Sequence, residues 1–274
     1  MDTTAGRGQT LFTGFRIAVV LVLAASFSVI LGGRLGPAAG APAERPVHIL
    51  LMGDSLAWEA EQDFSLDATG SGRAAVDTMA FGGTALCDWL PRLDAELSSF
   101  HPQAAVVEFA GNAFTRCMHD PVTGQPYSGA ALVAKYTADA EQAMRIFSAH
   151  GVTVYWSSAP AFRDGSPTPG ELSDVWRVIA GTWTDARFED AGQAVLDHGR
   201  YTDYLPCLPH EPCTYTNPAT GQPAARVRAP DGIHFCPTGA GAVRGLTAYC
   251  RVWSSGAWRY GAALLAPVAR DYHV

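Results

Sequence analysis

The feature that most constrains the fold is a set of three short apolar runs, each followed by glycine or small polar residues. The runs and the motifs after them are residues 47–52 with Gly53-Asp54-Ser55, residues 74–81 with Gly82-Gly83, and residues 104–109 with Ala110-Gly111-Asn112. Apolar runs of this length that end in turn-forming residues are typical of buried strands. We therefore expect three strands whose carboxyl ends carry the polar motifs.

Segments with helical spacing of apolar residues separate these runs. The predicted helices are residues 85–100, 130–150, 171–182 and 238–253, the last entered by Pro237, and further strands are predicted at 152–157 and 187–190. Alternating strands and helices predict an α/β fold in which a central parallel sheet has helices on both faces. Ligands bind such sheets beyond the carboxyl ends of the strands, where the three motifs fall.

Two long segments, residues 113–128 and 201–230, interrupt the alternation and are rich in Pro, Gly, Thr and Tyr. Each contains a similar hexapeptide, at residues 121–126 and 218–223, which we interpret as a turn. Loops of this length form either the rim of a substrate site or a surface elaboration held by disulfides. The sequence leaves both alternatives open.

The N-terminus indicates export. Residues 17–33 contain no charged side chain and follow Arg7 and Arg16. The segment spans about 25 Å as a helix, against about 30 Å for a hydrocarbon core. It is interpreted as an uncleaved anchor in preference to a signal peptide cut after residues 41–43, and its position disfavours a buried core helix.

The predicted organisation follows from that interpretation. It comprises a cytoplasmic segment at 1–16, an anchor or signal at 17–34, a linker at 35–46, and a domain at 47–274 that lies outside the cytoplasm, either membrane-anchored or secreted.

The amino-acid composition limits the kinds of molecule that the protein can bind. The chain is 48% hydrophobic and 16% charged, so it can bury a core. Its net charge is −7, its only lysine is Lys135, and its arginines are scattered. A phosphate-binding surface needs clustered basic side chains, so nucleic acid is excluded as a partner.

Six cysteines occur in the domain predicted to be exported: Cys87, Cys117, Cys207, Cys213, Cys236 and Cys250. An even count outside the cytoplasm indicates disulfides, and the absence of a CxxC motif disfavours zinc. Cys207 and Cys213 flank a short loop, and Cys87 and Cys117 both follow predicted strand ends, so these pairs are favoured.

The last two cysteines conflict with the predicted helix at 238–253. Such a helix would hold Cys236 and Cys250 about 20 Å apart, whereas a disulfide needs Cα atoms within about 7 Å. Either the helix breaks at a glycine or the connectivity is not sequential.

Ser55 is a candidate nucleophile because it directly follows a strand. Gly53 permits a tight turn, and the first turn of a following helix directs backbone N–H groups at a reacting oxygen. On this motif alone a helix N-cap is the better interpretation.

A base is supplied by Asp231-Gly232-Ile233-His234, where an acid and a histidine stand three residues apart. A turn of this length brings the carboxylate to imidazole Nδ1 and leaves Nε2 free for the serine proton. An ordinary turn is the alternative.

Oxyanion donors are expected at the other two motifs. Gly83 or Gly82 offers an unobstructed backbone N–H, and Asn112 offers a side-chain amide. A tight turn and a loop cap are the respective alternatives.

The four motifs in order resemble the blocks of the SGNH/GDSL hydrolase family across residues 47–253. The first block is the literal Gly53-Asp54-Ser55-Leu56 and the last matches fully, while aligning the second block favours Gly83. The third departs from the family pattern, because Gly111 directly precedes Asn112. The resemblance implies a flavodoxin-like three-layer α/β/α fold, no metal or cofactor, and ester hydrolysis through an acyl-enzyme.

The expected mechanism assigns each residue a role. Ser55 attacks, His234 is the base, Asp231 orients it, and the oxyanion is held by Ser55, Gly83 and Asn112. The expected substrate is a small-molecule, lipid or glycan ester. An O-acyltransferase acting on a sugar hydroxyl and a non-catalytic binding module are the alternatives.

Overall fold

A computed structural model describes residues 45–243 and 247–274. Its centre is a five-stranded parallel sheet in the order β2-β1-β3-β4-β5. The strands are β1 (Val47–Gly53), β2 (Ala74–Ala80), β3 (Ala104–Glu108), β4 (Thr153–Ser157) and β5 (Ala186–Glu189). This order is that of flavodoxin-like folds, which confirms the predicted fold class.

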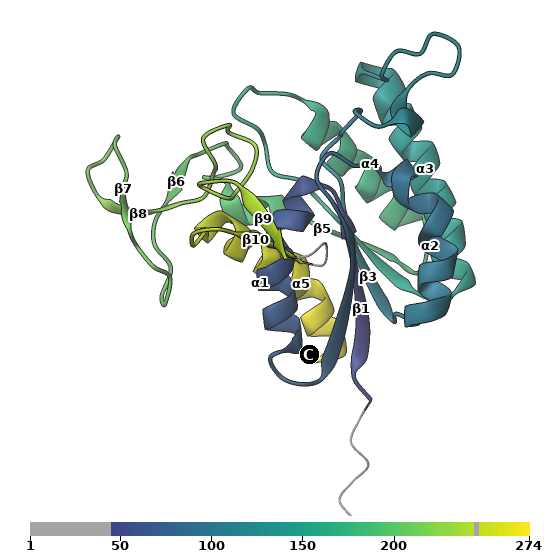
Figure 1. The fold of residues 1–274 in the computed structure, drawn as a ribbon, viewed down its shortest axis with the longest axis horizontal. Coiled ribbons are helices and arrows are strands. Elements are labelled where there is room, and N and C mark those ends of the chain that lie inside the picture. The colour runs from purple at the N-terminus through teal and green to yellow at the C-terminus, as the bar shows by residue number, and fades with distance from the viewer. Residues whose placement is uncertain (1–44, 244–246) are drawn as a thin grey trace, which may run out of the picture. The chain divides into compact units, whose positions relative to one another are not determined.

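Helices cover both faces of the sheet (Figure 1). One face packs against α2 (Leu86–Phe100), α3 (Gly129–Ala149) and α4 (Thr168–Thr182), and the other against α1 (Ser55–Thr69) and α5 (Ser255–Tyr272). Double coverage explains the continuous apolar run in β1, where Ile49 to Met52 are fully buried. Each such side chain contributes about 1.5–3 kcal/mol relative to an exposed one.

The prediction of a helix over residues 238–253 is wrong. This segment contains an antiparallel pair, β9 (Ala240–Val243) and β10 (Thr247–Cys250). Gly239, with φ +85°, and Gly241 weaken a helix, and the hairpin brings the Cα atoms of Cys236 and Cys250 to 5.0 Å in a disulfide. Because the described residues between the two cysteines contain no helix, the conflict disappears and the connectivity is sequential.

The final helix is α5, which the sequence patterns did not reveal. It begins after Ser254, whose hydroxyl accepts a hydrogen bond from the Ala257 N–H at 3.1 Å. This N-cap supplies a local start signal of a common kind.

The two other predicted disulfides, Cys87–Cys117 and Cys207–Cys213, are confirmed. The first joins α2 to the 3₁₀ turn η1 (Arg116–Met118), and a second such turn, η2 (Ala191–Val195), follows β5. The Cys207–Cys213 loop belongs to a small antiparallel sheet that projects from the main sheet (Figure 1). Its strands are β6 (Tyr204–Leu205), β7 (Tyr215–Thr216) and β8 (Pro223–Arg226).

The two long loops are mostly surface elaboration. Their hexapeptides form the predicted turns, since the Gly124 N–H donates to the Asp120 carbonyl and the Gly221 N–H to that of Asn217, both at 2.8 Å. Only Phe114 and the end of the second loop reach the pocket described below.

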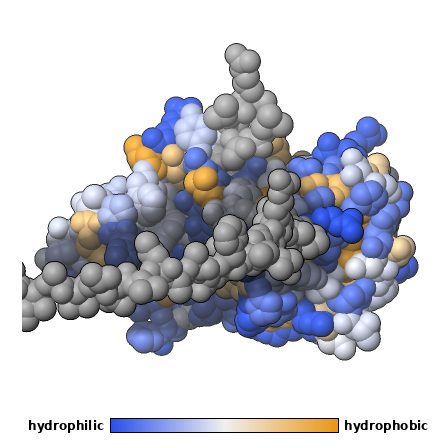
Figure 2. Space-filling view, turned by 90° about the horizontal axis from the view of Figure 1, so that it is seen from below, coloured by the Kyte–Doolittle hydropathy of each residue, from blue (hydrophilic) through white to orange (hydrophobic). Residues whose placement is uncertain are grey.

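The predicted N-terminal segments at 1–16 and 17–34 lie outside the described residues. Within the described part, no helix has the length and apolarity needed to cross a membrane. On the face seen in Figure 2, the atoms not drawn in grey are mainly hydrophilic, with scattered hydrophobic residues.

Candidate active site

Ser55 is the first residue of α1, directly beyond the carboxyl end of β1. The N-cap is Asp54, whose carboxylate accepts from the Leu56 N–H at 3.0 Å, so capping does not account for the serine. The turn requires Gly53, because a Cβ there would lie 2.5 Å from the Ala57 Cβ and 2.6 Å from the Glu108 carbonyl oxygen. The half-buried Ser55 therefore lies at the carboxyl end of the parallel strands.

The acid–histidine pair has the predicted geometry. Asp231 Oδ2 lies 2.7 Å from His234 Nδ1, and Asp231 Oδ1 accepts from the backbone N–H groups of Ile233 and His234 at 2.9 and 3.0 Å. Burial alone would raise the pKa of Asp231, but the Ile233 N–H and the His234 ring outweigh it and lower that pKa. Asp231 is therefore held as a carboxylate that fixes the ring.

Arg163, which the sequence patterns did not single out, clamps this loop from the segment after β4. Its guanidinium donates to the Pro230 carbonyl at 2.8 Å, and its backbone N–H donates to the Gly232 carbonyl at 3.1 Å. Gly232 has φ +80°, and a Cβ there would lie 2.5 Å from the Arg163 Cβ. Asp203 and Tyr201 in turn hold the guanidinium, at 2.8 and 3.1 Å.

The candidate oxyanion donors lie at the ends of β2 and β3. Gly83 has φ +77°, and a Cβ on Gly82 would lie 3.9 Å from that of Ser55. Asn112 Nδ2 donates to Asp54 Oδ2 and to the Thr84 carbonyl, both at 3.1 Å. Both amide hydrogens of Asn112 therefore already have acceptors.

The compressed third motif has a steric reason. Gly111 has φ +108°, and a Cβ there would overlap the Thr168 side chain at the start of α4. The chain thus passes so close to α4 that glycine is required directly before Asn112.

Two buried carboxyl groups, those of Asp54 and Glu108, lie below the turn that carries Ser55. Burial raises the pKa of Asp54 to about 6, although hydrogen bonds from the Ala110 and Leu56 N–H groups lower it. Burial and the neighbouring Asp54 raise the pKa of Glu108 well above its ordinary value. Glu108 also accepts from the Ala57 N–H at 3.1 Å. Burial and the neighbouring Asp54 charge therefore favour the protonated form of Glu108.

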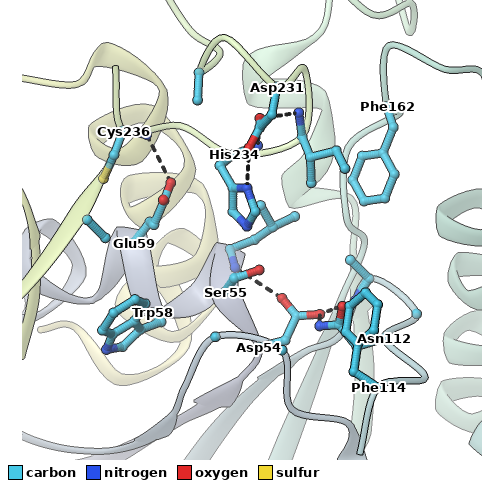
Figure 3. Close-up of a pocket in the computed structure, with 18 of the residues that line it drawn as sticks. Asp54, Ser55, Trp58, Glu59, Asn112, Phe114, Phe162, Asp231, His234 and Cys236 are labelled. Carbon is cyan, nitrogen blue, oxygen red and sulfur yellow. Dashed lines mark hydrogen bonds and ion pairs between the residues drawn. The ribbon is translucent and has the colours of Figure 1, made fainter. Parts of the chain in front are cut away.

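A pocket of about 840 Å³ unites these elements. Figure 3 shows the His234 ring between Asp231 and Ser55, with Asn112 beside Asp54. The chemically relevant lining residues are Asp54, Ser55, Gly82, Gly83, Asn112, Asp231 and His234. The structure therefore brings every site residue predicted from the sequence into one cavity.

The pocket wall is aromatic and acidic. Trp58, Phe114 and Phe162 line it, and Phe81 lies against Trp58 with ring centroids 5.3 Å apart. Among the described residues that line it, four are carboxylic acids and none is Lys or Arg.

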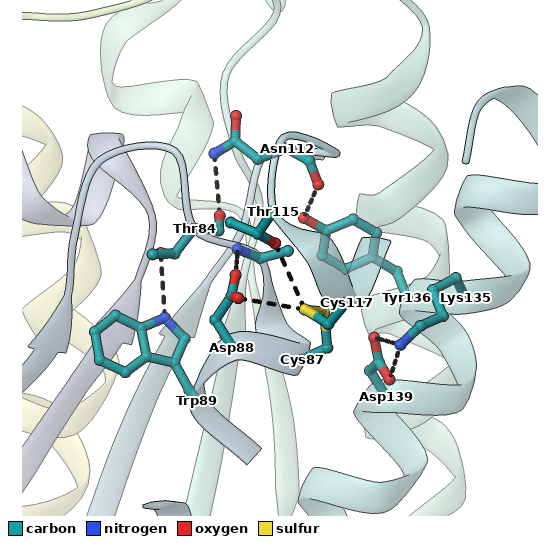
Figure 4. Close-up of a disulfide and its surroundings, with 11 residues drawn as sticks. Thr84, Cys87, Asp88, Trp89, Asn112, Thr115, Cys117, Lys135, Tyr136 and Asp139 are labelled. Atoms are coloured by element: carbon teal, nitrogen blue, oxygen red, sulfur yellow. Dashed lines mark hydrogen bonds and ion pairs between the residues drawn. A yellow bond between two sulfur atoms is a disulfide. The ribbon is translucent and has the colours of Figure 1, made fainter. Parts of the chain in front are cut away.

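The Cys87–Cys117 disulfide lies near the segment that carries Asn112 (Figure 4). Near it, the Trp89 indole donates to the Thr84 hydroxyl at 3.2 Å, and the Tyr136 hydroxyl donates to the Asn112 carbonyl at 2.9 Å. Asn112 is therefore held through both its side chain and its backbone.

Two groups of potential metal ligands occur among the described residues, and each consists of a disulfide pair with one carboxylate, Glu59 or Asp88. Oxidised sulfur atoms are not thiolate ligands, so neither group fits a metal site.

Residues 48–246 match a family described as "Protein of unknown function (DUF459)". The chain belongs to the DUF459 family. No curated protein matches this DUF459 chain.

Solved structures resemble this DUF459 protein in fold. A crystal structure of an acetyl esterase mutant with acetate ion aligns with a TM-score of 0.52 and 8% identity, over 83% of this chain and 98% of the other. A GDSL-like lipase from Bacteroides thetaiotaomicron aligns with a TM-score of 0.46 and 14% identity, over 82% of this chain and 88% of the other. A lipase/acylhydrolase from Enterococcus faecalis aligns with a TM-score of 0.42 and 19% identity, over 54% of this chain and 78% of the other. At 8% identity, the likeness to the acetyl esterase structure shows the fold alone.

Proposed function

We propose that this DUF459 protein is a serine esterase that cleaves carboxylic esters through an acyl-enzyme on Ser55. The observation that carries the proposal is that Ser55 and His234 line the same pocket, with His234 Nδ1 bound by Asp231 at 2.7 Å. An activated serine needs a base that is itself oriented by a third group. The fold shared with the acetyl esterase agrees with this reaction.

In the first half of the reaction, Ser55 Oγ attacks the ester carbonyl carbon and His234 Nε2 takes the hydroxyl proton. The tetrahedral intermediate collapses, the C–O bond to the alcohol breaks, and His234 returns the proton to that alcohol. In the second half, water attacks the acyl-enzyme by the same route and releases the acid. Asp231 keeps Nδ1 protonated and stabilises the imidazolium.

The oxyanion is held by the backbone N–H groups of Ser55 and Gly83 and by the Asn112 amide. Because both Asn112 hydrogens are already bonded, to Asp54 and Thr84, the amide exchanges one of these acceptors for the oxyanion.

The preferred substrate is an ester that carries no negative charge. Asp164 and Asp231 line the cavity together with the buried Asp54 and Glu59, and no Lys or Arg does so among the described residues. Such a lining repels carboxylate and phosphate groups. Acetate esters of matched alcohols carrying a carboxylate, no charge or a trimethylammonium group test this. We expect roughly tenfold lower kcat/KM for the anionic ester at low salt, with a smaller difference at 1 M salt.

The domain acts outside the cytoplasm in this proposal. All six cysteines form disulfides, which persist in oxidising compartments. The N-terminal segment at 17–34 attaches the domain to the membrane if it is not cut.

A fluorophosphonate probe tests the nucleophile. We expect the wild type to be labelled and to hydrolyse 4-nitrophenyl acetate, and Ser55→Ala to lose both properties. Ser65→Ala, on the same helix, is the matched control and keeps both. Labelling that persists in Ser55→Ala, or a wild type without hydrolysis, would reject the esterase. Product analysis with a sugar acceptor distinguishes hydrolysis from acyl transfer.

A further inference from the structure

Glu59 lies on α1, one helical turn after Ser55, and its residue surface is only 5% exposed. It lines the pocket on the same side as Cys236 (Figure 3). Burying a carboxylate is costly unless its oxygens are hydrogen-bonded. The partners of Glu59 therefore indicate what the side chain does.

Those partners belong to the residues directly after the candidate base. Glu59 Oε2 accepts from the backbone N–H groups of Phe235 at 2.6 Å and of Cys236 at 2.9 Å. The Phe235 carbonyl is itself held by the Ser254 hydroxyl at 2.8 Å, and Cys236 is bonded to Cys250. Glu59 thus fastens the segment that follows His234 to the helix that begins with Ser55.

The carboxylate also interacts electrostatically with the base. The pKa of Glu59 is raised, because burial outweighs the Phe235 and Cys236 N–H groups and the His234 charge, which lower it. The Asp231 charge raises it further. Among the described residues, His234 and Asp231 are the titratable groups whose charges shift this pKa. The Glu59 carboxylate and the His234 ring are therefore close enough to interact through their charges.

We propose that Glu59 is a positioning residue: it fixes the His234 segment against the Ser55 helix, and its negative charge supports the imidazolium formed as His234 takes the serine proton. This inference rests on the proposed esterase reaction. Arg163 holds the same loop before Asp231 and at Gly232, so the catalytic segment is secured on both sides.

Three variants separate the two roles. Glu59→Ala removes the acceptor and the charge, whereas Glu59→Gln keeps an acceptor oxygen and removes only the charge. Glu61→Gln is the matched control, because Glu61 is also a buried acid on α1 but accepts from the Thr78 hydroxyl at 2.7 Å. Hydrolysis of 4-nitrophenyl acetate is measured from pH 4.5 to 9, with thermal unfolding of each variant.

We expect Glu59→Ala to lower kcat roughly 10- to 100-fold with KM changed less than about threefold, because the base is displaced. Glu59→Gln should keep kcat within about tenfold of the wild type, and the acid limb of its kcat/KM profile should move to lower pH by roughly 0.5–1 unit. The direction follows because, without the nearby negative charge, a lower pH is needed to protonate the base. Glu61→Gln should leave the acid limb in place.

The inference is overturned if Glu59→Ala retains wild-type kcat, or if the acid limbs of Glu59→Gln and the wild type coincide. Should Glu59→Ala fail to fold, the Glu59→Gln profile decides alone. A wild type without esterase activity rejects the proposed function, whereas an active wild type with an unaffected Glu59→Ala rejects only the role of Glu59.

Discussion

The side-chain amide of Asn112 donates a 3.1 Å hydrogen bond to the carboxylate of Asp54, the residue that precedes the candidate nucleophile. The same carboxylate accepts from the Leu56 N–H and the Ala110 N–H. Asp54 therefore links the turn after β1 with the loop after β3, and it keeps the candidate oxyanion donor at a fixed place relative to Ser55.

Replacing Asn112 with Ala tests this donor. We expect kcat to fall about 100- to 1,000-fold with little change in KM, since one oxyanion donor is lost. Asn217→Ala, in a turn that does not line the pocket, serves as the control and should leave kcat unchanged. Steady-state kinetics on 4-nitrophenyl acetate measure both constants. A raised KM with an unchanged kcat would assign Asn112 to substrate binding instead.

Removing the Arg163 side chain should impair the histidine loop. We expect Arg163→Ala to lower kcat roughly tenfold because Pro230, and with it Asp231, loses its anchor. Arg163→Lys should recover only part of the loss, since an ammonium lacks the planar fork that reaches Tyr201, Pro230 and Asp203 together.

Arg177→Ala provides the control for that comparison. Arg177 is an exposed arginine on α4 that pairs with Asp174 and Asp190 and does not line the pocket. Equal kcat values for Arg163→Ala and Arg177→Ala would contradict the clamp.

The Cys87–Cys117 disulfide should matter for activity as well as stability. The double variant Cys87→Ser/Cys117→Ser opens a loop with a sequence separation of 30, which costs about 3–4 kcal/mol in a chain-entropy estimate. We expect this variant to have lower esterase activity than the wild type even at temperatures at which it is still folded, because the Asn112 loop is no longer held by the disulfide. Cys207→Ser/Cys213→Ser should retain activity, and thermal unfolding with parallel assays would show whether the two variants differ.

Glu108→Gln should reveal the protonated carboxyl under the site. The pKa of Glu108 is raised by burial and by Asp54, so the native state holds this proton to a higher pH than the unfolded chain. As pH rises above about 4.5, the wild type therefore loses stability that the neutral amide does not lose. We expect the difference in Tm, Glu108→Gln minus wild type, to increase between pH 4 and pH 7. Each 1 kcal/mol of stability that the wild type loses corresponds to about 2–4 °C in this difference. A difference that stays constant or shrinks with pH contradicts this assignment.

Local signals in the sequence were sufficient to locate the site. Ser55, Gly83 and Asn112 follow successive strands, and parallel strands end at the same edge of a sheet, so their proximity follows from the strand pattern. The Asp231–His234 pair closes within a single turn. The roles assigned to these residues remain predictions that the variants above test.

The supporting residues could not be found in this way, because their contacts join distant segments. Glu59 meets Phe235 across 176 positions, and Arg163 meets Pro230 across 67. Neither contact leaves a local pattern. The antiparallel pair of β9 and β10 was also missed, because the spacing of apolar residues favoured a helix there. The pairing of Cys236 with Cys250, which is compatible with strands and not with a helix, is again a contact that leaves no local pattern.

Two of the three disulfides join segments that carry the site, at Cys87–Cys117 and Cys236–Cys250, whereas the central sheet contains none. The sheet can therefore assemble by burial of its strands before any sulfur is oxidised. Under the proposed function, oxidation then becomes a separate, later event that shapes the substrate cavity. The specific activity of protein made in a reducing host would then depend on how completely its thiols had been oxidised.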